Sequence, residues 1–240
     1  MFNLHECLTQ PILLYGSDLW GLSKTNTNSI DLLLNWFLRL VLGVKQGTCI
    51  PMLLGESGVY PPSVFCHINV ILYYIRLNNL PYGSVLKSVF LDLQDNLFSN
   101  NNWCINVNSL ANEYGLNIND FPYDNETKKY IKSVVKEKFV SEWRIKMDVR
   151  PGLKLYKMFK HEFRCEPYLQ NVKNTNFRKM FTRLRTSSHF LEIERGRYVN
   201  KSECDRLCAL CNTVENEFHF VMVCPLYNDL QCDFFNQKIA

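Results

Sequence analysis

Apolar residues recur with helical spacing along most of the chain, and the first clear stripe lies within residues 30–42. Its members keep the i, i+3, i+4, i+7 rhythm of one helix face: Ile30, Leu33, Leu34, Phe37, Leu38, Val41 and Leu42. Ser29 can cap the N-terminus of this helix, and Gly43 can end it. The pattern therefore predicts a helix that directs one face into a core.

More helices are predicted beyond a loop rich in glycine and proline, residues 47–62. A long apolar helix should follow Pro61-Pro62 and run to about Leu80, because Pro81 cannot continue it. Two shorter helices are expected after it, at 84–99 and 109–114.

The composition becomes basic after a predicted boundary at 117–123. Apolar residues with helical spacing then extend over 126–149 up to Pro151-Gly152, and basic helices are expected at 153–163 and 176–189. No stretch alternates as a strand does, so the fold class is mainly α. We expect three segments: a helical bundle-like region at 1–120, a basic helical segment at 123–200 and a small CCHC zinc-binding module at 201–232.

The net charge of +4 conceals a strong asymmetry. Residues 1–127 carry 5 Lys/Arg and 10 Asp/Glu, whereas residues 128–206 carry 21 and 9. A basic block of this kind is typical of proteins that bind a phosphate backbone. The alternative is a solvated helical surface with scattered lysines.

The strongest chemical signal is a set of four metal-type ligands within seventeen residues near the C-terminus. Cys208, Cys211, His219 and Cys224 follow the spacing C-x2-C-x7-H-x4-C. Three thiolates and one imidazole suit a closed tetrahedral Zn²⁺ site, which folds a small module and leaves no position for a substrate. The alternative is four buried residues without a metal, because free cysteine packs well. Cys204 and Cys232 flank the set and are taken as bystanders.

A metal-nucleated module also needs a small apolar core. We expect that core to consist of Phe218, Phe220, Val221 and Leu226. Pro225 fits a helix stop just after the last ligand.

Cysteine usage also bears on the compartment. Ten cysteines would suit a disulfide framework, but the spacings outside 204–224 are irregular and no signal peptide is recognisable. We therefore expect an intracellular protein of the nucleus or cytoplasm, not a secreted one. The most apolar run, 30–44, is too short to span a membrane and carries Arg39.

Four groups of residues, in order, resemble the region that follows the polymerase domain in LINE-type (non-LTR) retrotransposon reverse transcriptases. The first group is PILLYGSDLWG at 11–21. The second runs from Phe37-Leu38-Arg39 to Gly43-Val44, then Thr48, Gly55-Glu56, Gly58 and Pro61. The third comprises Leu184-Arg185, His189, Ile193-Glu194 and Gly196-Arg197-Tyr198. The fourth is the cysteine–histidine motif with Glu217-Phe218-His219-Phe220 and Cys224-Pro225-Leu226-Tyr227.

The departures from that family are as informative as the likeness. A reverse transcriptase needs adjacent Asp carboxylates that hold two Mg²⁺ ions, and this sequence contains no Asp-Asp pair. The endonuclease domain of the family is also missing. We therefore expect a fragment of a mobile element that does not polymerise DNA, with a polymerase domain as a candidate partner encoded upstream.

The resemblance implies binding of RNA or DNA through the basic segment 128–206, which would position template or target. The phosphate contacts that it implies are Arg178, Lys179, Arg183, Arg185, Arg195 and Arg197. Tyr198 and Phe220 are candidate stacking surfaces for unpaired bases, although both rings could instead belong to a core.

Two other function classes compete with nucleic-acid binding. In a protein-interaction module, the zinc knuckle would dock a partner through exposed apolar surface and the basic helices would only be solvated. A metal-dependent enzyme would need an open metal site or paired carboxylates, and the sequence offers neither. Histidines near acidic residues, such as His189 near Glu192, are expected to be packing or surface residues. The tryptophans are expected to anchor cores rather than to form binding platforms: Trp20, Trp36, Trp103 and Trp143.

Overall fold

The computed structural model describes residues 5–95, 102–150, 153–229 and 232. The chain divides into two compact units, which are described separately. The first unit comprises residues up to 41 together with 50–169, and the second comprises 42–49 together with the chain from 170 onward. The predicted boundary at 117–123 thus falls inside the first unit.

Helices make up both units. The first unit contains η1 (His5–Thr9), α2 (Gln10–Leu13), α3 (Ser17–Trp20), α4 (Lys24–Leu42), α5 (Ile50–Ser57), α6 (Pro62–Asn78), α7 (Val85–Asp95), α8 (Trp103–Glu113), α9 (Asn125–Val149), α10 (Lys154–Phe159) and most of α11 (Pro167–Asn171). The second contains α12 (Thr175–Arg185), α13 (Glu192–Tyr198), η3 (Glu203–Asp205), η4 (His219–Val223) and η5 (Pro225–Tyr227). Within the described residues the only β-pairing is one antiparallel bridge, Leu207 with Val214. The predicted mainly α class is confirmed.

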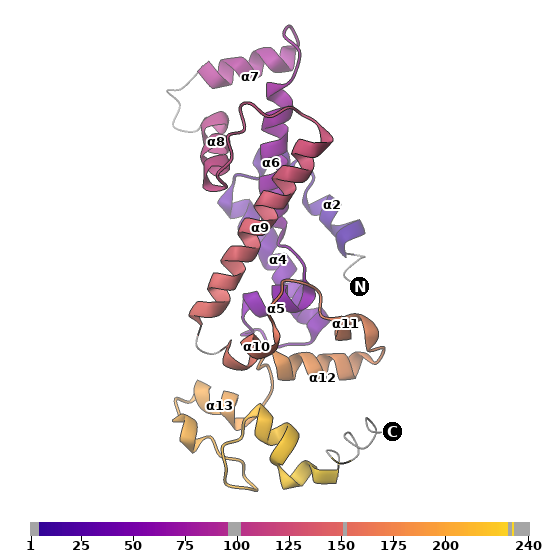
Figure 1. Ribbon diagram of the computed structural model, residues 1–240, viewed down its shortest axis with the longest axis vertical. Helices are drawn as coiled ribbons and strands as arrows, with labels where there is room; N and C mark the ends of the chain where they lie inside the picture. The colour runs from indigo at the N-terminus through magenta and orange to yellow at the C-terminus, as the bar shows by residue number, and fades with distance from the viewer. Residues whose placement is uncertain (1–4, 96–101, 151–152, 230–231, 233–240) are drawn as a thin grey trace. The chain divides into compact units, whose positions relative to one another are not determined.

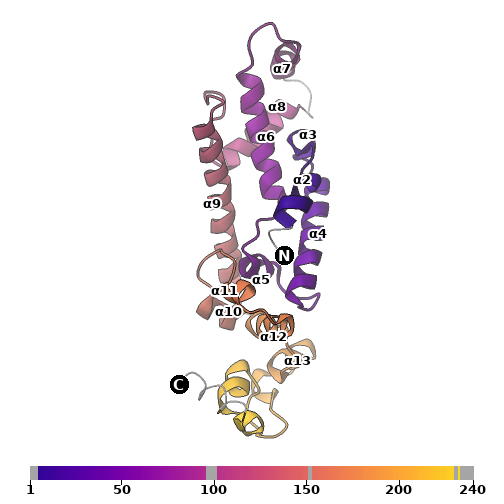
Figure 2. The same ribbon diagram turned by 90° about the vertical axis from the view of Figure 1, so that its right-hand side faces the viewer.

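Helix α6 is the centre of the first unit. It packs against α3, α7, α8 and α9, and Figures 1 and 2 show α9 running alongside it. The buried apolar core includes residues of α6, α7, α8 and α9: Ile68, Ile71, Ile75, Phe90, Val107, Ile131 and Val135. No helix in the described part of the chain is both long and apolar enough to cross a membrane.

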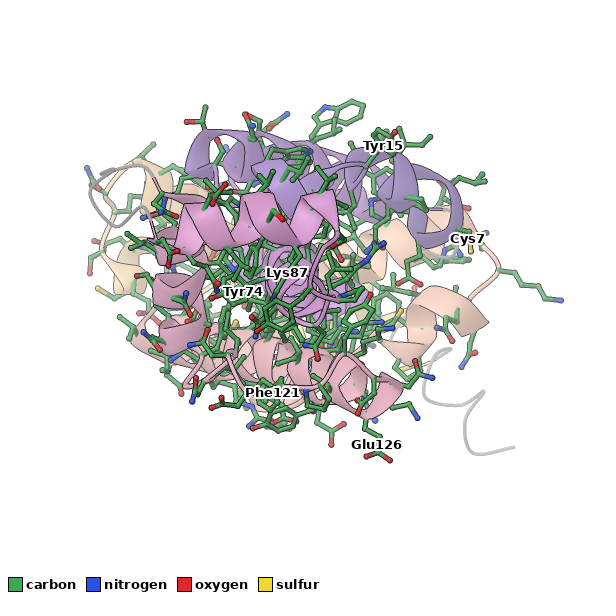
Figure 3. All side chains as sticks on the ribbon, turned by 90° about the horizontal axis from the view of Figure 1, so that it is seen from above. Cys7, Tyr15, Tyr74, Lys87, Phe121 and Glu126 are labelled. Carbon is green, nitrogen blue, oxygen red and sulfur yellow. The ribbon has the colours of Figure 1, made fainter. Side chains whose placement is uncertain are left out.

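Polar side chains are satisfied inside this core. Tyr74 is buried (labelled in Figure 3). Its hydroxyl donates to Asn119 at 2.9 Å and accepts from Gln94 and Asn108 at 3.0 and 3.1 Å. Lys87 is also buried, and its ammonium donates to the Asn78 carbonyl at the C-terminus of α6 at 2.6 Å. A cation at that position suits the partial negative charge of a helix C-terminus.

Helix α4 covers the predicted stripe but begins earlier, and the prediction is wrong for one stripe residue, Leu33, which is 47% exposed. It starts at Lys24, so the polar residues before Ser29 are helical, and the Ser29 hydroxyl donates to the Thr25 carbonyl at 2.9 Å rather than capping the helix. Leu34, Leu38 and Leu42 are buried as expected. The helix ends as predicted, because Gly43 follows with a φ of +69° that favours glycine.

The exposed face of α4 is also apolar. Its solvent-accessible residues include Leu32, Leu33, Trp36 and Leu40. Trp36, 55% exposed, was expected to anchor a core, and that expectation is wrong. One helix face reaches the interior, and Trp36 lies outside the stripe that occupies it.

The predicted loop at 47–62 contains a helix, α5, that the sequence pattern did not reveal. Its residues from Pro51 to Ser57 are buried, so no polar face marks its period. Gly55 lies within it because a Cβ there would be 2.8 Å from Trp143 and from the Tyr156 hydroxyl. The glycine that suggested a loop is instead required for close packing.

Gly58 ends α5 under two constraints. Its φ is +65°, and a Cβ at this position would lie 2.2 Å from the Cys165 backbone nitrogen. We expect Gly58→Ala to destabilise the protein more than Gly83→Ala, because Gly83 shares a positive φ but a Cβ there would meet no atom within 4 Å. The difference should be about 1–3 kcal/mol, a typical cost of overpacking. Urea unfolding of the two variants measures it, and equal losses would contradict this packing.

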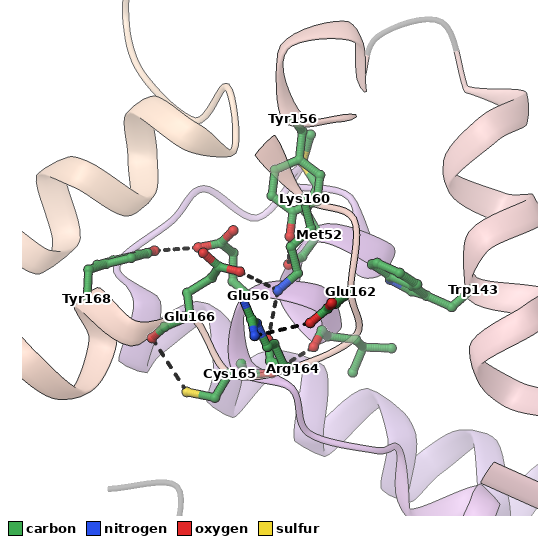
Figure 4. Close-up of polar contacts among 12 residues, drawn as sticks. Met52, Glu56, Trp143, Tyr156, Lys160, Glu162, Arg164, Cys165, Glu166 and Tyr168 are labelled. Carbon is green, nitrogen blue, oxygen red and sulfur yellow. Dashed lines mark hydrogen bonds and ion pairs between the residues drawn. The ribbon is translucent and has the colours of Figure 1, made fainter. Parts of the chain in front are cut away.

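A buried polar network joins α5 to the segment 160–168 (Figure 4). The Lys160 ammonium donates to Glu166 at 2.5 Å and to the Arg164 carbonyl at 2.7 Å. Glu56, with no exposed surface, accepts a hydrogen bond from the Tyr168 hydroxyl at 2.5 Å. The Glu166 N–H donates to the Glu56 carbonyl at 2.9 Å. These hydrogen bonds connect α5 to a segment about 110 residues later in the chain.

The remaining helices follow the sequence prediction to different degrees. Helices α6 and α9 lie where they were predicted, and Asp124 caps α9 through the Thr127 N–H at 2.7 Å. Helix α8 begins at Trp103, earlier than expected, because Asn102 caps it. Helix α7 ends at Asp95, and the rest of the range predicted for it lies outside the described residues, as does Pro151-Gly152.

Candidate metal centre

A tight hairpin in the second unit presents the first two cysteines. Leu207 pairs with Val214, and the Cys208 N–H donates to the Thr213 carbonyl at 2.8 Å. The Asn212 N–H closes the turn on the Cys208 carbonyl at 3.0 Å, with Asn212 at a φ of +53°. Asparagine tolerates that left-handed conformation better than most residues. The two-residue spacer therefore places both thiols on one side of the turn.

A widened helical turn presents the other two ligands. The Asn216 side chain accepts from the His219 N–H at 2.8 Å and starts the turn. The Cys224 N–H donates to the His219 carbonyl at 2.8 Å, an i to i+5 bond typical of a π-helix. This bond brings residues five apart to the same side. Pro225 begins the next turn, so the predicted stop after the last ligand is confirmed.

Cys208, Cys211, His219 and Cys224 come together with metal-site geometry. Their ligand atoms all lie within 4.8 Å of one another. The Cys224 Sγ is 4.0 Å from the Cys208 Sγ and 3.7 Å from the Cys211 Sγ. A tetrahedral ion with metal–sulfur bonds of about 2.3 Å needs sulfurs about 3.8 Å apart. The cluster could therefore bind one metal ion.

The histidine supports the same interpretation. His219 is buried, and its Nε2 atom has no hydrogen-bond partner in the structure. Its Nδ1 atom lies 3.3 Å from the Thr213 hydroxyl, which can orient the ring. A buried imidazole nitrogen without a partner is costly, and a metal bond would satisfy it.

The thiols differ in pKa because their surroundings differ. The backbone N–H groups of Cys211 and Leu210 donate to the Cys208 sulfur and lower its pKa to about 7. Burial and the neighbouring sulfurs raise the pKa of Cys211 to about 11. Donors that converge on one cysteine sulfur stabilise the thiolate form that binds metals.

Helix α13 and the preceding segment are anchored to this centre by contacts that the sequence did not reveal. His189 Nε2 lies 2.9 Å from Glu217, two residues before the His219 ligand. Glu215 accepts from the Glu192 N–H through its carboxylate at 2.7 Å and from the Ile193 N–H through its carbonyl at 3.0 Å. The partners lie more than twenty residues apart, and no spacing rule connects them.

The pairing with His189 lowers the pKa of the Glu217 carboxylate. Burial alone would raise its pKa, but the hydrogen bond from His189 and a backbone N–H outweigh burial and hold the pKa below its ordinary value. The histidine that the sequence placed near Glu192 is thus paired with Glu217. The expectation that His189 is a packing residue agrees with this contact.

The predicted phosphate contacts on α12 differ in exposure, because Arg183 is exposed whereas Arg178, Lys179 and Arg185 are half-buried. The Lys179 side chain packs against Gly43, and the Arg183 Nε donates to the Gly43 carbonyl at 2.5 Å. Arg178 donates to the Thr175 hydroxyl at 3.2 Å, and the Arg185 guanidinium lies 5.8 Å from the Phe181 ring centroid. Arg183 therefore also serves the fold of the second unit.

The predicted contacts on α13 carry acidic partners. Arg195 pairs with Glu192 at 3.0 Å and Arg197 with Glu194 at 2.7 Å. Arg195 is 65% exposed, so its pair contributes little and can exchange for phosphate. Arg197 is 46% exposed, but its partner Glu194 is buried, so this pair also serves the fold. Tyr198 is 65% exposed and stays available for stacking.

The apolar core predicted for the metal module is wrong in part. Phe218 and Leu226 were expected inside it, yet they are 66% and 61% exposed. Phe220 is half-buried and packs against Tyr227 with ring centroids 4.6 Å apart. A module this small buries few side chains, so the ligand cluster occupies its centre.

Comparisons with known protein families, curated proteins and solved structures found no match to this chain. The likeness to LINE-type reverse transcriptases therefore rests on the residues quoted for it. Function has to be argued from the metal cluster, the charge distribution and the exposed side chains.

Proposed function

We propose that this chain is a non-catalytic nucleic-acid-binding segment, akin to the C-terminal region of a LINE-type reverse transcriptase, which positions template or target. The observation that carries the proposal is the excess of 21 basic over 9 acidic residues in 128–206. Such an excess attracts a polyanion and supports counterion release on binding.

The position of these cations supports the proposal further. On α9, the basic side chains at 129, 132, 138, 144 and 146 are exposed, while Ile131, Val135 and Trp143 are buried in the core. In the second unit, Lys173, Arg183, Arg195, Arg197 and Lys201 are exposed. A phosphate backbone could reach these side chains without unfolding either unit.

We further propose that the ion held by the cysteine–histidine cluster is Zn²⁺. Thiolates are soft ligands that disfavour Mg²⁺ and Ca²⁺, and three sulfurs with one imidazole complete a tetrahedral shell. When bound, the ion would supply structural cross-linking rather than Lewis-acid chemistry, because no coordination position remains open. Cys208, Cys211, His219 and Cys224 would hold it.

Charge reversal on α12 tests the proposal. We expect Arg178→Glu with Arg185→Glu to weaken binding of all sequences alike, because phosphate contacts carry no sequence information. The slope of log K against log salt should fall by about 1.4 or more for single strands. Fluorescence anisotropy with two RNA oligomers of unrelated sequence measures both quantities.

The matched control reverses two exposed cations in the acidic half of the chain, Lys24→Glu with Arg76→Glu. It changes the net charge equally but leaves the basic segment intact. If the control weakens binding as much as the α12 variant, net charge rather than this surface governs the interaction. Loss restricted to one RNA sequence would also contradict backbone contact.

A second candidate function is docking of a protein partner by the metal module. The observation that favours it is the apolar exposure of that module, since several side chains are 47–66% exposed: Leu210, Phe218, Met222, Val223 and Leu226. Exposed apolar clusters mark interaction sites. This candidate gains support if the protein fails to bind RNA or DNA even at low salt.

A further inference from the structure

The polar side of α12 is its buried side. Thr182 and Thr186 are almost fully buried, and the Lys179 side chain covers Gly43. Phe177 and Met180 on the other side are 63% and 62% exposed. The sequence placed these apolar residues on one face, as a core-facing stripe would be, but here that face is directed to solvent.

Three exposed rings in this unit each have a cation over them. The Lys45 ammonium lies 3.9 Å from the Phe190 ring centroid, and this ring is 71% exposed. The Arg197 guanidinium lies 5.6 Å from the Tyr198 ring, and Arg185 lies 5.8 Å from the Phe181 ring. These six residues are called the ring–cation surface.

The short segment 43–48 contacts residues of, or next to, the ring–cation surface. The Lys45 N–H donates to the Ser188 hydroxyl at 2.7 Å, and its ammonium donates to the His189 carbonyl at 2.5 Å. Gly43 contacts the side chain of Lys179 on α12. A Cβ at Gly47 would lie 3.6 Å from the Tyr198 hydroxyl. The segment therefore lies beside Phe190, through Lys45, and beside Tyr198, through Gly47. Phe181 belongs to the same compact unit, on α12.

We infer that the ring–cation surface binds unpaired bases of a single-stranded nucleic acid, with bases on the rings and phosphates on the cations. This inference rests on the proposed function and names the form of nucleic acid. Aromatic rings beside cations are the elements that single-strand binding proteins combine. Bases inside a duplex cannot reach such rings.

The same surface is poorly suited to a lipid membrane. An interfacial helix separates a continuous apolar face from a charged face. Here each ring has its own cation, so apolar and charged groups alternate across the surface. Repeated alternation of this kind matches a polymer in which a base and a phosphate recur at every residue.

The test uses Phe190→Ala with Tyr198→Ala in the full, metal-loaded chain. We expect affinity for a labelled 12-nucleotide single-stranded RNA to fall by about 30-fold or more, since each stacked base contributes about 1–3 kcal/mol. The salt slope and the affinity for a duplex of the same sequence should be unchanged. The control, Tyr15→Ala with Tyr82→Ala, removes two rings that are 87% and 86% exposed in the first unit.

A second measurement needs no variant. The unmodified protein should bind an abasic 12-mer, which keeps the phosphates, at least 30-fold more weakly than the RNA. Equal binding of the abasic and natural strands, or equal loss of duplex and single-strand affinity in the ring variant, would overturn the inference but leave the proposed function standing. No binding of any nucleic acid at low salt would overturn both. Binding of anionic phospholipid vesicles in preference to RNA would assign the surface to membranes.

Discussion

Replacing Cys211 by serine should unfold the terminal metal module while leaving the first unit folded. Metal binding contributes about 10–16 kcal/mol to the folding of small zinc modules. The module offers little else, because Phe218 and Leu226 are exposed and a single β-bridge closes its hairpin. In ¹H–¹⁵N spectra, amides of residues 206–229 should collapse to random-coil positions, whereas amides of α6 and α9 should keep their shifts.

The matched control for this variant is Cys204→Ser. Cys204 is exposed and lies outside the ligand cluster, so its loss should leave the spectrum of the module unchanged. Chelation of the unmodified protein should reproduce the effect of Cys211→Ser. Equal loss of signals from α6 and from the module would show that the chain folds as one cooperative body. An unchanged module after chelation would mean that no metal supports it.

The second large effect is expected in the network beneath α5. Lys160→Met should destabilise the first unit by about 3–5 kcal/mol, the usual cost of breaking a buried ion pair from one side. The side chains of Lys160 and Glu166 are only 1% and 14% exposed, so the carboxylate left behind cannot be fully solvated. The Arg164 carbonyl would also lose this donor. Thermal and urea unfolding monitored by circular dichroism measure the loss.

An exposed ion pair in the same segment provides the control. Arg164 and Glu162 lie 3.1 Å apart with side chains 66% and 65% exposed. Arg164→Met should therefore cost at most about 1 kcal/mol. Similar losses of stability in Lys160→Met and Arg164→Met would show that burial does not distinguish the two ion pairs. The buried contacts drawn in Figure 4 would then not stabilise the first unit as proposed.

Sequence reasoning identified the features that are encoded locally. The spacing of apolar residues over 126–149 predicted α9 and its buried face, and Gly43 marks the end of α4 by its conformational preference. The four metal ligands were found because a knuckle confines them to a short segment. Each of these signals lies within a few helical turns of chain.

What sequence reasoning missed depends on contacts between distant segments. The glycines at 55 and 58 suggested a loop. They are instead required because a Cβ at these positions would collide with Trp143 and Cys165, about a hundred residues away. The pairing of His189 with Glu217 and of Lys45 with Phe190 follows from the fold of the second unit alone. The stripe of Phe177 and Met180 could not be assigned to a core or to solvent from its period, because periodicity defines a face but not what covers it.

The most direct test of the central claim is a salt series of single-stranded RNA binding by the zinc-loaded protein, with a chelated sample alongside. We expect tight binding at low salt, an affinity that falls steeply and linearly on a log–log plot, and weaker binding after chelation. Absence of binding at the lowest salt would contradict it and leave a protein-docking module whose basic residues form a solvated surface.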